Sequence, residues 1–204
     1  MKTISCMNID GSLLRAFGAE DKSYKKGELV YREDDHAMYY FQIEEGKVKL
    51  NNYDENGKEF IHNILAKNQS FGDSMLFLEK AYPMNAVCLL PSEIIRVPKD
   101  NFLELLKEHP HLSVSMNACL SHRLYFKAIM IQSMASQSPV SRLKGLMDYL
   151  KSYHDGECGQ AFNVELTRQQ IASLTGLRVE TVIRALKKME KENILSLESR
   201  KILY

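Results

Sequence analysis

Close to the C-terminus, two charged side chains are spaced so that they could read double-stranded DNA. Arg184 follows Glu180 by four residues, which places both on the same side of a helix. An arginine can donate two hydrogen bonds to O6 and N7 of guanine, and a glutamate can accept one from N4 of cytosine. The two residues could therefore recognise one or two G·C pairs in a major groove.

Two short helices joined by a tight turn must position these side chains. The first is predicted to begin after Thr167, a favourable N-cap, and to end at Gly176, which permits the turn. The second is predicted over residues 178–190, with a buried stripe formed by Val182, Leu186 and Met189. This stripe leaves Glu180 and Arg184 facing outward, as the recognition helix of a helix-turn-helix requires.

The last residues of the chain support the same interpretation. Residues 193–204 alternate around Ser199-Arg200, which is typical of a short hairpin and would form a wing. A plain pair of solvated helices also carries exposed Arg and Glu. The capped helix, the glycine turn, the polar face and the hairpin together favour a winged helix-turn-helix.

The first half of the chain has the pattern of a β-rich domain. Short runs of strand-forming residues lie between residues 25 and 97 and are separated by glycines. Among them, Asp54 to Gly57 is predicted to be a hairpin turn in which Asn56-Gly57 supplies positive φ angles. We therefore expect a sandwich, a barrel or a roll.

Helices are predicted to follow the strands. Asp100 is expected to cap a helix that ends before Pro110. Residues 111–137 then contain neither Gly nor Pro, which predicts one long helix. Its later turns are apolar nearly all round, so that it needs neighbours on two sides. This favours a homodimer over the alternative of a helix in an intramolecular core. After Ser138-Pro139, another amphipathic helix is expected from Ser141 to Tyr153.

Composition narrows the class of protein. With 204 residues, 45% apolar and 26% charged, the chain suits two soluble domains. No apolar stretch is long enough to span a membrane, and the N-terminus lacks the apolar core of a secretory signal, so we expect a cytoplasmic protein. The four cysteines are scattered, and no metal, haem or iron–sulfur cluster is expected. From Pro139 onward, 11 Lys and Arg against 8 Asp and Glu leave a small basic surplus that suits a nucleic-acid partner.

The run LTRQQIASLTGLRVETVIRALKKMEKENIL at residues 166–195 resembles the winged helix-turn-helix of the Crp/Fnr superfamily of transcription regulators. Residues 24–28, 41–48 and 71–73 resemble landmarks of that family's β-roll. The resemblance implies an α+β fold in three parts. These are a double-stranded β-helix, or β-roll, as effector or sensor domain over residues 1–110, a dimerisation helix over 111–137, and a DNA-binding domain over 138–204.

The resemblance also implies roles at DNA. Thr167 and Arg168 would hold backbone phosphates, while Glu180 and Arg184 would enter the major groove of an inverted repeat with TTGA-like half-sites. Apolar side chains on the same helix, at Val179 and Ile183, could contact only thymine methyls or neighbouring apolar surface. The expected DNA-binding residues are Thr167, Arg168, Gln169, Arg178, Val179, Glu180, Thr181, Arg184 and Lys187.

The expected sensor domain departs from the members of the family that bind cyclic nucleotides. Those members pair the cyclic phosphate with an arginine, and Met84 stands at that position here. Lys127-Ala128 stands where cyclic AMP binders offer paired hydroxyls to the base. Because a buried phosphate without a counter-charge is costly, we expect an effector other than cyclic AMP, or none, and no cofactor. A possible effector pocket comprises Phe71, Gly72, Asp73, Ser74, Met84, Asn85 and Lys127.

These observations predict a homodimeric transcription regulator that binds double-stranded DNA and, as an activator, contacts RNA polymerase. The alternative is a small-molecule-binding regulatory module that acts through a protein partner. Such a module has no need of an outward face formed by Glu180 and Arg184. An enzyme is not expected, because the sequence contains no GxSxG, HExxH, P-loop or GxGxxG motif.

Overall fold

The computed structural model describes residues 7–135, 138–152, 162–199 and 201–204. These residues fall into two compact units, one up to Ser121 and the other from His122 onward. The division passes through a single helix, α4 (Pro110–Ala135), which is continuous across it. The expected three-part division, with boundaries after residues 110 and 137, stays a prediction.

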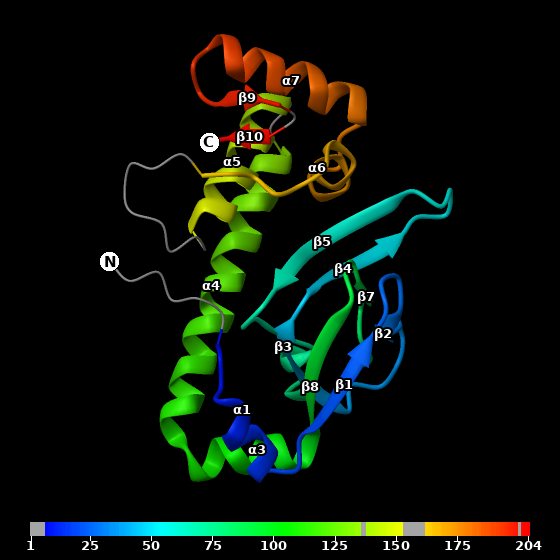
Figure 1. Ribbon diagram of the computed structural model, residues 1–204, viewed down its shortest axis with the longest axis vertical. Coiled ribbons are helices and arrows are strands. Elements are labelled where there is room, and N and C mark those ends of the chain that lie inside the picture. Colours follow the sequence, from blue (N-terminus) through cyan, green and yellow to red (C-terminus); the bar gives the residue numbers. More distant parts are fainter. Residues whose placement is uncertain (1–6, 136–137, 153–161, 200) are drawn as a thin grey trace. The chain divides into compact units, whose positions relative to one another are not determined.

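The N-terminal unit is built on two four-stranded antiparallel sheets (Figure 1). One has the strand order β1-β8-β3-β6 and the other β2-β7-β4-β5. This confirms the predicted β-rich domain. The strands are β1 (Glu20–Tyr24), β2 (Leu29–Tyr31), β3 (Tyr39–Glu45), β4 (Lys47–Tyr53), β5 (Glu59–Ala66), β6 (Ser70–Phe71), β7 (Asn85–Cys88) and β8 (Ser92–Pro98).

The turn between β4 and β5 differs from the prediction in one detail. The amide of Gly57 donates to the carbonyl of Asp54 at 2.9 Å, so the expected turn is present. Gly57 has a φ of 75°, but Asn56 does not have a positive φ. The carboxylate of Asp54 accepts hydrogen bonds from the amides of Asn56 and Lys58 at 2.9 and 2.8 Å. Because this side chain holds the turn, only one residue has to adopt the left-handed conformation.

The segment before β1 is docked on the first sheet. Its helix α1 (Gly11–Ala16) is capped by Asp10, and Leu14 is fully buried. Ahead of it, the backbone of Ile9 is held by the buried side chain of Gln42 in β3. The amide of Ile9 donates to Oε1 of Gln42 at 2.9 Å, and Nε2 of Gln42 donates to the carbonyl of Ile9 at 2.8 Å. The sequence pattern predicted neither α1 nor β1, since both depend on contacts with residues much later in the chain.

The helix α3 (Lys99–Glu108) begins two residues earlier than a helix capped by Asp100 would begin. Its N-cap is Pro98, and Asp100 is the second residue of the helix rather than the cap, so that prediction was wrong. Proline has a fixed φ and no N–H to satisfy, which suits the start of a helix. Asp100 still lies in the first turn, where a carboxylate interacts favourably with the helix dipole. The helix ends before Pro110, as expected.

The long helix was predicted over residues 111–137, and α4 confirms it over 26 residues. Met116 and Cys119 are buried in the N-terminal unit. In the C-terminal unit, the ring of Phe126 packs against that of Tyr149, with ring centroids 4.2 Å apart. Large apolar side chains of α4 are nevertheless exposed, namely Val114, Leu124, Tyr125 and Ile131.

The C-terminal unit continues with three shorter helices and a hairpin. Their bounds are α5 (Pro139–Ser152), α6 (Arg168–Thr175), α7 (Val179–Lys191), β9 (Ser196–Glu198) and β10 (Lys201–Leu203). The predicted hairpin is confirmed, and Phe162 extends it by exchanging two backbone hydrogen bonds of 2.8 Å with Tyr204. None of the helices in the described ranges has the length and hydrophobicity that a membrane-spanning segment requires.

Candidate functional site

The first helix of the predicted helix-turn-helix has the caps that the sequence predicted. The hydroxyl of Thr167 accepts a hydrogen bond from the amide of Gln170 at 3.1 Å, and the side chain of Gln170 accepts one from the amide of Thr167 at 2.8 Å. This reciprocal pair is a capping box. Gly176 ends the helix with a φ of 69°, a left-handed conformation that glycine adopts without strain. Helix α7 therefore begins at Val179, three residues after Gly176.

Helix α7 has one apolar side and one charged side. Val182, Leu186 and Met189 are buried, as predicted, and Ala185 joins them. Their burial holds α7 against α5 and α6, which are its main neighbours. The opposite side exposes Glu180, Arg184, Lys187 and Lys188. The sequence therefore predicted correctly which side of this helix would be available to a partner.

The charges on this exposed side are not neutralised by any residue in the described part of the chain. In the ranges that the structure describes, Glu180, Arg184 and Lys187 form no ion pair. Lys188 makes only a loose contact of 3.8 Å with Glu192. Their hydrogen-bonding groups thus remain available for base edges or phosphates.

The other predicted DNA-binding residues surround this surface. Thr167 and Gln169 are exposed at the start of α6, and Arg168 between them is half-buried and already has an interaction within the chain. Arg178 is the exposed N-cap of α7, and Thr181 is half-buried in its first turn. Val179 is half-buried beside Glu180. Their assignment to DNA stays a prediction.

One contact that positions the wing was not predicted. The carboxylate of Glu190, near the end of α7, accepts a hydrogen bond of 3.2 Å from the amide of Leu197 in β9. The sequence does not indicate such a bond, because a glutamate that bonds to a neighbouring strand and a glutamate that is only solvated occur in the same kind of charged helix.

In the N-terminal unit, the expected effector-pocket residues around Asp73 are engaged in the fold itself. Asp73 is 1% exposed, and its carboxylate accepts hydrogen bonds from the hydroxyl of Ser70 at 3.0 Å and the amide of Ser74 at 2.8 Å. Gly72 has a φ of 75°. A Cβ atom there would lie 2.9 Å from Cδ2 of Phe41, so the glycine is needed for close packing. Phe71 is buried against the same ring, with centroids 5.1 Å apart.

The remaining expected pocket residues lie on other elements. Asn85 starts β7, and its side chain binds the amide of Glu33 at 3.0 Å and the carbonyl of Asn51 at 3.2 Å. Met84 precedes it and is half-buried. Phe71 and Asn85 belong to different sheets of the unit, and Lys127 is exposed on the part of α4 that belongs to the C-terminal unit.

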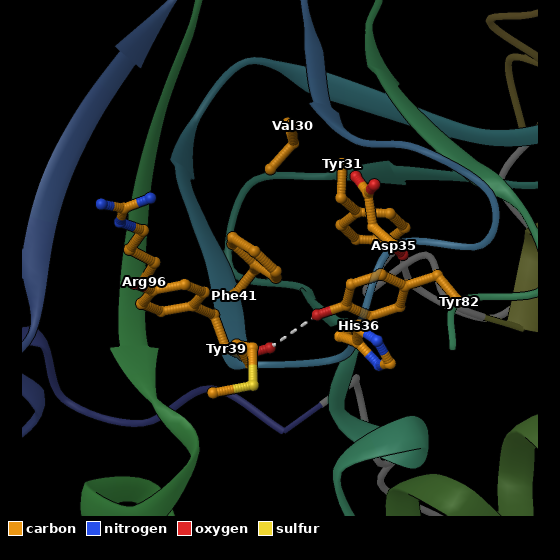
Figure 2. A pocket seen from close by; sticks show the side chains of 9 residues that line it. Val30, Tyr31, Asp35, His36, Tyr39, Phe41, Tyr82 and Arg96 are labelled. Carbon is orange, nitrogen blue, oxygen red and sulfur yellow. Dashed lines mark hydrogen bonds between the residues drawn. The ribbon is translucent and has the colours of Figure 1, made fainter. Parts of the chain in front are cut away.

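The structure places a cavity elsewhere in the N-terminal unit, beside a cluster of aromatic rings (Figure 2). Tyr31 stacks on Tyr82 with centroids 3.7 Å apart and also packs near Phe41 and Phe71. All four rings are buried, and the cluster joins the two sheets, since Tyr31 lies in β2 of one sheet and Phe41 and Phe71 lie in β3 and β6 of the other. The cavity has a volume of about 300 Å³ and is lined by Val30, Tyr31, Asp35, His36, Met38, Tyr39, Phe41, Tyr82 and Arg96.

Polar groups at this cavity are largely engaged. The hydroxyl of Tyr82 donates to the carbonyl of Tyr39 at 3.2 Å, as the dashed line in Figure 2 shows. Burial raises the pKa of Tyr82 to about 12, so the phenol stays protonated. The guanidinium of Arg96 lies 4.6 Å from the ring centroid of Tyr39 and is paired with Glu20 at 2.7 Å. Sequence reasoning missed this cavity because its lining comes from segments far apart in the chain.

Comparisons with known proteins match both units. The family described as the cyclic nucleotide-binding domain matches residues 21–109, and that described as the Crp-like helix-turn-helix domain matches residues 141–204. The global nitrogen regulator of a Nostoc species is 28% identical, over 92% of this chain and 86% of its own length. The cAMP-activated global transcriptional regulator CRP of Haemophilus influenzae is 26% identical, over 87% of this chain and 80% of its own length.

Solved structures share the fold. A CooA mutant from Carboxydothermus hydrogenoformans matches with a TM-score of 0.79 and 19% identity, over 97% of this chain and 87% of its own. The c-di-GMP responsive global regulator CLP from Xanthomonas campestris matches with a TM-score of 0.75 and 18% identity, over 95% and 98% of the two chains. The order of β-rich unit, long helix and helix-turn-helix unit is therefore common to these proteins.

Proposed function

The chain belongs to the Crp/Fnr superfamily of transcription regulators, and on this premise we propose that it binds a palindromic operator as a homodimer. The observation that carries the proposal is the exposed side of α7, where Glu180, Arg184 and Lys187 have no ion-pair partner within the described ranges. A helix with one buried stripe and one such charged side fits a major groove. The protein is a transcription regulator and not an enzyme.

In this proposal the residues of the surface have distinct roles. Arg184 donates to a guanine and Glu180 accepts from a cytosine, so that these two specify sequence. Phosphate contacts from Thr167, Gln169, Arg178 and Lys187 hold the helix in register without specifying bases. The exposed N-termini of α6 and α7 favour such contacts, since free backbone N–H groups attract phosphate oxygens.

The exposed apolar side of α4 supports the homodimer. Val114 and Leu124 are each 70% exposed, and Ile131 is 68% exposed. Leu124 and Ile131 are seven residues apart, and Val114 lies ten residues before Leu124, so all three fall on the side of the helix that a coiled-coil seam uses. Exposed apolar groups of this size, repeated along one helix, are stabilised when a second copy covers them. Two copies would present two recognition helices, which a palindrome requires.

We further propose that the effector is a molecule other than cyclic AMP, or that there is none. The half-buried Met84 offers no charge to a cyclic phosphate. The carboxylate of Asp73 is already hydrogen-bonded to Ser70 and Ser74, and the rings of Tyr31, Phe41, Phe71 and Tyr82 are buried against one another. A regulator of this kind acts in the cytoplasm and, as an activator, contacts RNA polymerase.

The test is selection of bound duplexes from a random pool by the full-length protein, at one fixed salt concentration, with and without cyclic AMP. Salt is fixed because phosphate contacts make every affinity depend on it. We expect an inverted repeat to be enriched and cyclic AMP to have no effect. Recovery of sequences without a palindrome would contradict the proposal, and a cyclic AMP requirement would contradict the effector assignment.

A further inference from the structure

We propose that the cavity beside the aromatic cluster of the N-terminal unit binds a small organic cation of the quaternary ammonium type, with the carboxylate of Asp35 as its counter-charge. None of the residues expected to form an effector pocket lines this cavity. The proposal concerns the N-terminal unit alone, so it goes beyond the proposed function and does not depend on DNA binding.

The cavity lies away from the expected effector residues. Its lining includes Val30 of β2, the edge strand of one sheet, and Arg96 of β8, which lies next to the edge strand β1 of the other. The expected effector residues begin at Phe71 in β6, the opposite edge strand of that second sheet. A volume of about 300 Å³ is at the lower end of the range for small-molecule sites, so the cavity suits only a small ligand.

Aromatic rings form much of the lining. Tyr31, Phe41 and Tyr82 are at most 7% exposed and lie deepest, whereas Tyr39 is half-buried. The face of an aromatic ring has a negative electrostatic potential, which attracts cations. One cation already uses this attraction here, because the guanidinium of Arg96 lies 4.6 Å from the ring centroid of Tyr39.

The charges around the cavity favour a cation over an anion. Asp35 is exposed, and its carboxylate accepts a hydrogen bond from the amide of Arg32 at 2.8 Å. Among the residues that the structure describes, no cation pairs with this carboxylate. The charge of Arg96, by contrast, is matched by Glu20 at 2.7 Å, and Figure 2 shows Arg96 and Asp35 on different sides of the rings. A ligand therefore meets one unmatched negative charge.

A quaternary ammonium group fits these surroundings better than a primary amine. Its methyl groups can pack on aromatic rings and on Met38, which is 56% exposed, and it needs no hydrogen bonds. A primary ammonium would bring three N–H donors. The carbonyl of Tyr39, at this cavity, already accepts a hydrogen bond from the hydroxyl of Tyr82 at 3.2 Å. Donors left without acceptors would weaken binding.

The experiment compares choline with the neutral alcohol of the same shape, in which a carbon atom replaces the ammonium nitrogen. Each is titrated into the full-length protein by calorimetry, at pH 8, because His36 also lines the cavity and histidine gains positive charge in mildly acidic solution. We expect saturable binding of choline and about tenfold weaker binding of the alcohol, since the alcohol lacks both charge interactions. Equal binding of the two, or no binding of choline, would overturn the proposal.

Asp34 provides a matched control for the counter-charge. It is the exposed neighbour of Asp35, it does not line the cavity, and its φ of 69° is one that asparagine also adopts. Asp35→Asn should weaken choline binding about two- to fivefold, whereas Asp34→Asn should leave it unchanged. Equal losses would show that choline responds only to the overall charge of the surface, which contradicts the assigned contact.

Two variants of Tyr39 test the aromatic contribution. Tyr39→Phe keeps the ring and should bind choline like the native protein, while Tyr39→Leu should bind it about two- to fivefold more weakly. The neutral alcohol should bind both variants alike, and thermal melting checks that both are folded. If Tyr39→Leu loses affinity for choline and alcohol equally, the ring acts only by packing and the proposed cation contact is wrong. Operator binding is not among these readouts, so the proposed function stands or fails separately.

Discussion

The carboxylate of Glu190 accepts a hydrogen bond of 3.2 Å from the backbone amide of Leu197, joining the recognition helix α7 to the wing strand β9. We predict that Glu190→Ala loosens the wing, whereas Glu190→Gln, which keeps an acceptor oxygen, does so much less. Losing one exposed bond should reduce the free energy of unfolding by about 1 kcal/mol or less. Faster hydrogen exchange of the Leu197 amide in the alanine variant alone is the expected signature. Equal exchange in all three proteins would show that the bond does not hold the wing.

Gly72 and Gly57 form a matched pair for testing how tightly the N-terminal unit is packed. Both have a φ of 75°, but a Cβ on Gly72 would lie 2.9 Å from Phe41, while one on Gly57 would meet no atom within 4 Å. Alanine at Gly57 should cost only the left-handed backbone penalty, about 1 kcal/mol. Alanine at Gly72 should cost about 1–3 kcal/mol more, because the aromatic cluster must shift. Urea unfolding followed by tyrosine fluorescence measures both, and equal losses would contradict the packing argument.

The raised pKa of Tyr82 predicts that the folded protein loses stability at alkaline pH. Burial raises its pKa to about 12 in the folded protein, against 10.0 for an ordinary tyrosine. The folded state therefore binds this proton more tightly than the unfolded state, and the resulting stabilisation is complete below pH 10 and lost as the pH rises through 12. Tyr82→Phe should reduce the slope of unfolding free energy against pH in this window. Some slope will remain, since the pKa values of Tyr24 and Tyr204 are also raised by burial. An unchanged slope in Tyr82→Phe would exclude Tyr82 as its source.

Arg184 and Lys187 should differ in how their loss affects DNA binding. Arg184→Ala should cost about 1–3 kcal/mol on the selected operator and relax discrimination at one base pair. Lys187→Ala should weaken selected and random duplexes alike and reduce the salt dependence by about one charge. Titrations of both variants on both duplexes at several salt concentrations test this. Equal losses of Arg184→Ala on operator and random DNA would contradict the assigned base contact.

Leu124 tests the homodimer. A glutamate in its place would put a charge in the middle of the proposed seam on α4, where each copy would face the same charge on its partner, so Leu124→Glu should be monomeric and lose operator binding. Leu90→Glu provides a control, since Leu90 is also exposed, at 44%, but lies on the loop before β8. Sedimentation equilibrium and light scattering measure the mass of each variant. A native protein that is already monomeric, or a dimeric Leu124→Glu, would exclude this seam.

The helix-turn-helix could be predicted in detail because its determinants are close together in sequence. Thr167 caps a helix of eight residues whose third residue is Gln170, and Gly176 ends it. The spacing of Val182, Leu186 and Met189 sets the buried side of the next helix. Each of these depends on neighbours within one or two turns. The outward direction of Glu180 and Arg184 followed from the same periodicity. Asp100 shows the limit, because both Pro98 and Asp100 are acceptable near a helix start and local pattern does not choose between them.

Contacts between distant strands could not be predicted in this way. The aromatic cluster is formed by residues of four separate segments, namely Tyr31, Phe41, Phe71 and Tyr82. Their spacing in the sequence does not indicate that they pack together. The same holds for the two hydrogen bonds between the backbone of Ile9 and the side chain of Gln42, which are 33 residues apart. By itself, the sequence determined the fold class and the outward-facing side of α7, since both follow from local periodicity and turn chemistry. Only the tertiary structure decided that the four aromatic rings pack against one another and that the Asp73 carboxylate is hydrogen-bonded, because such contacts arise when distant strands are brought together by packing.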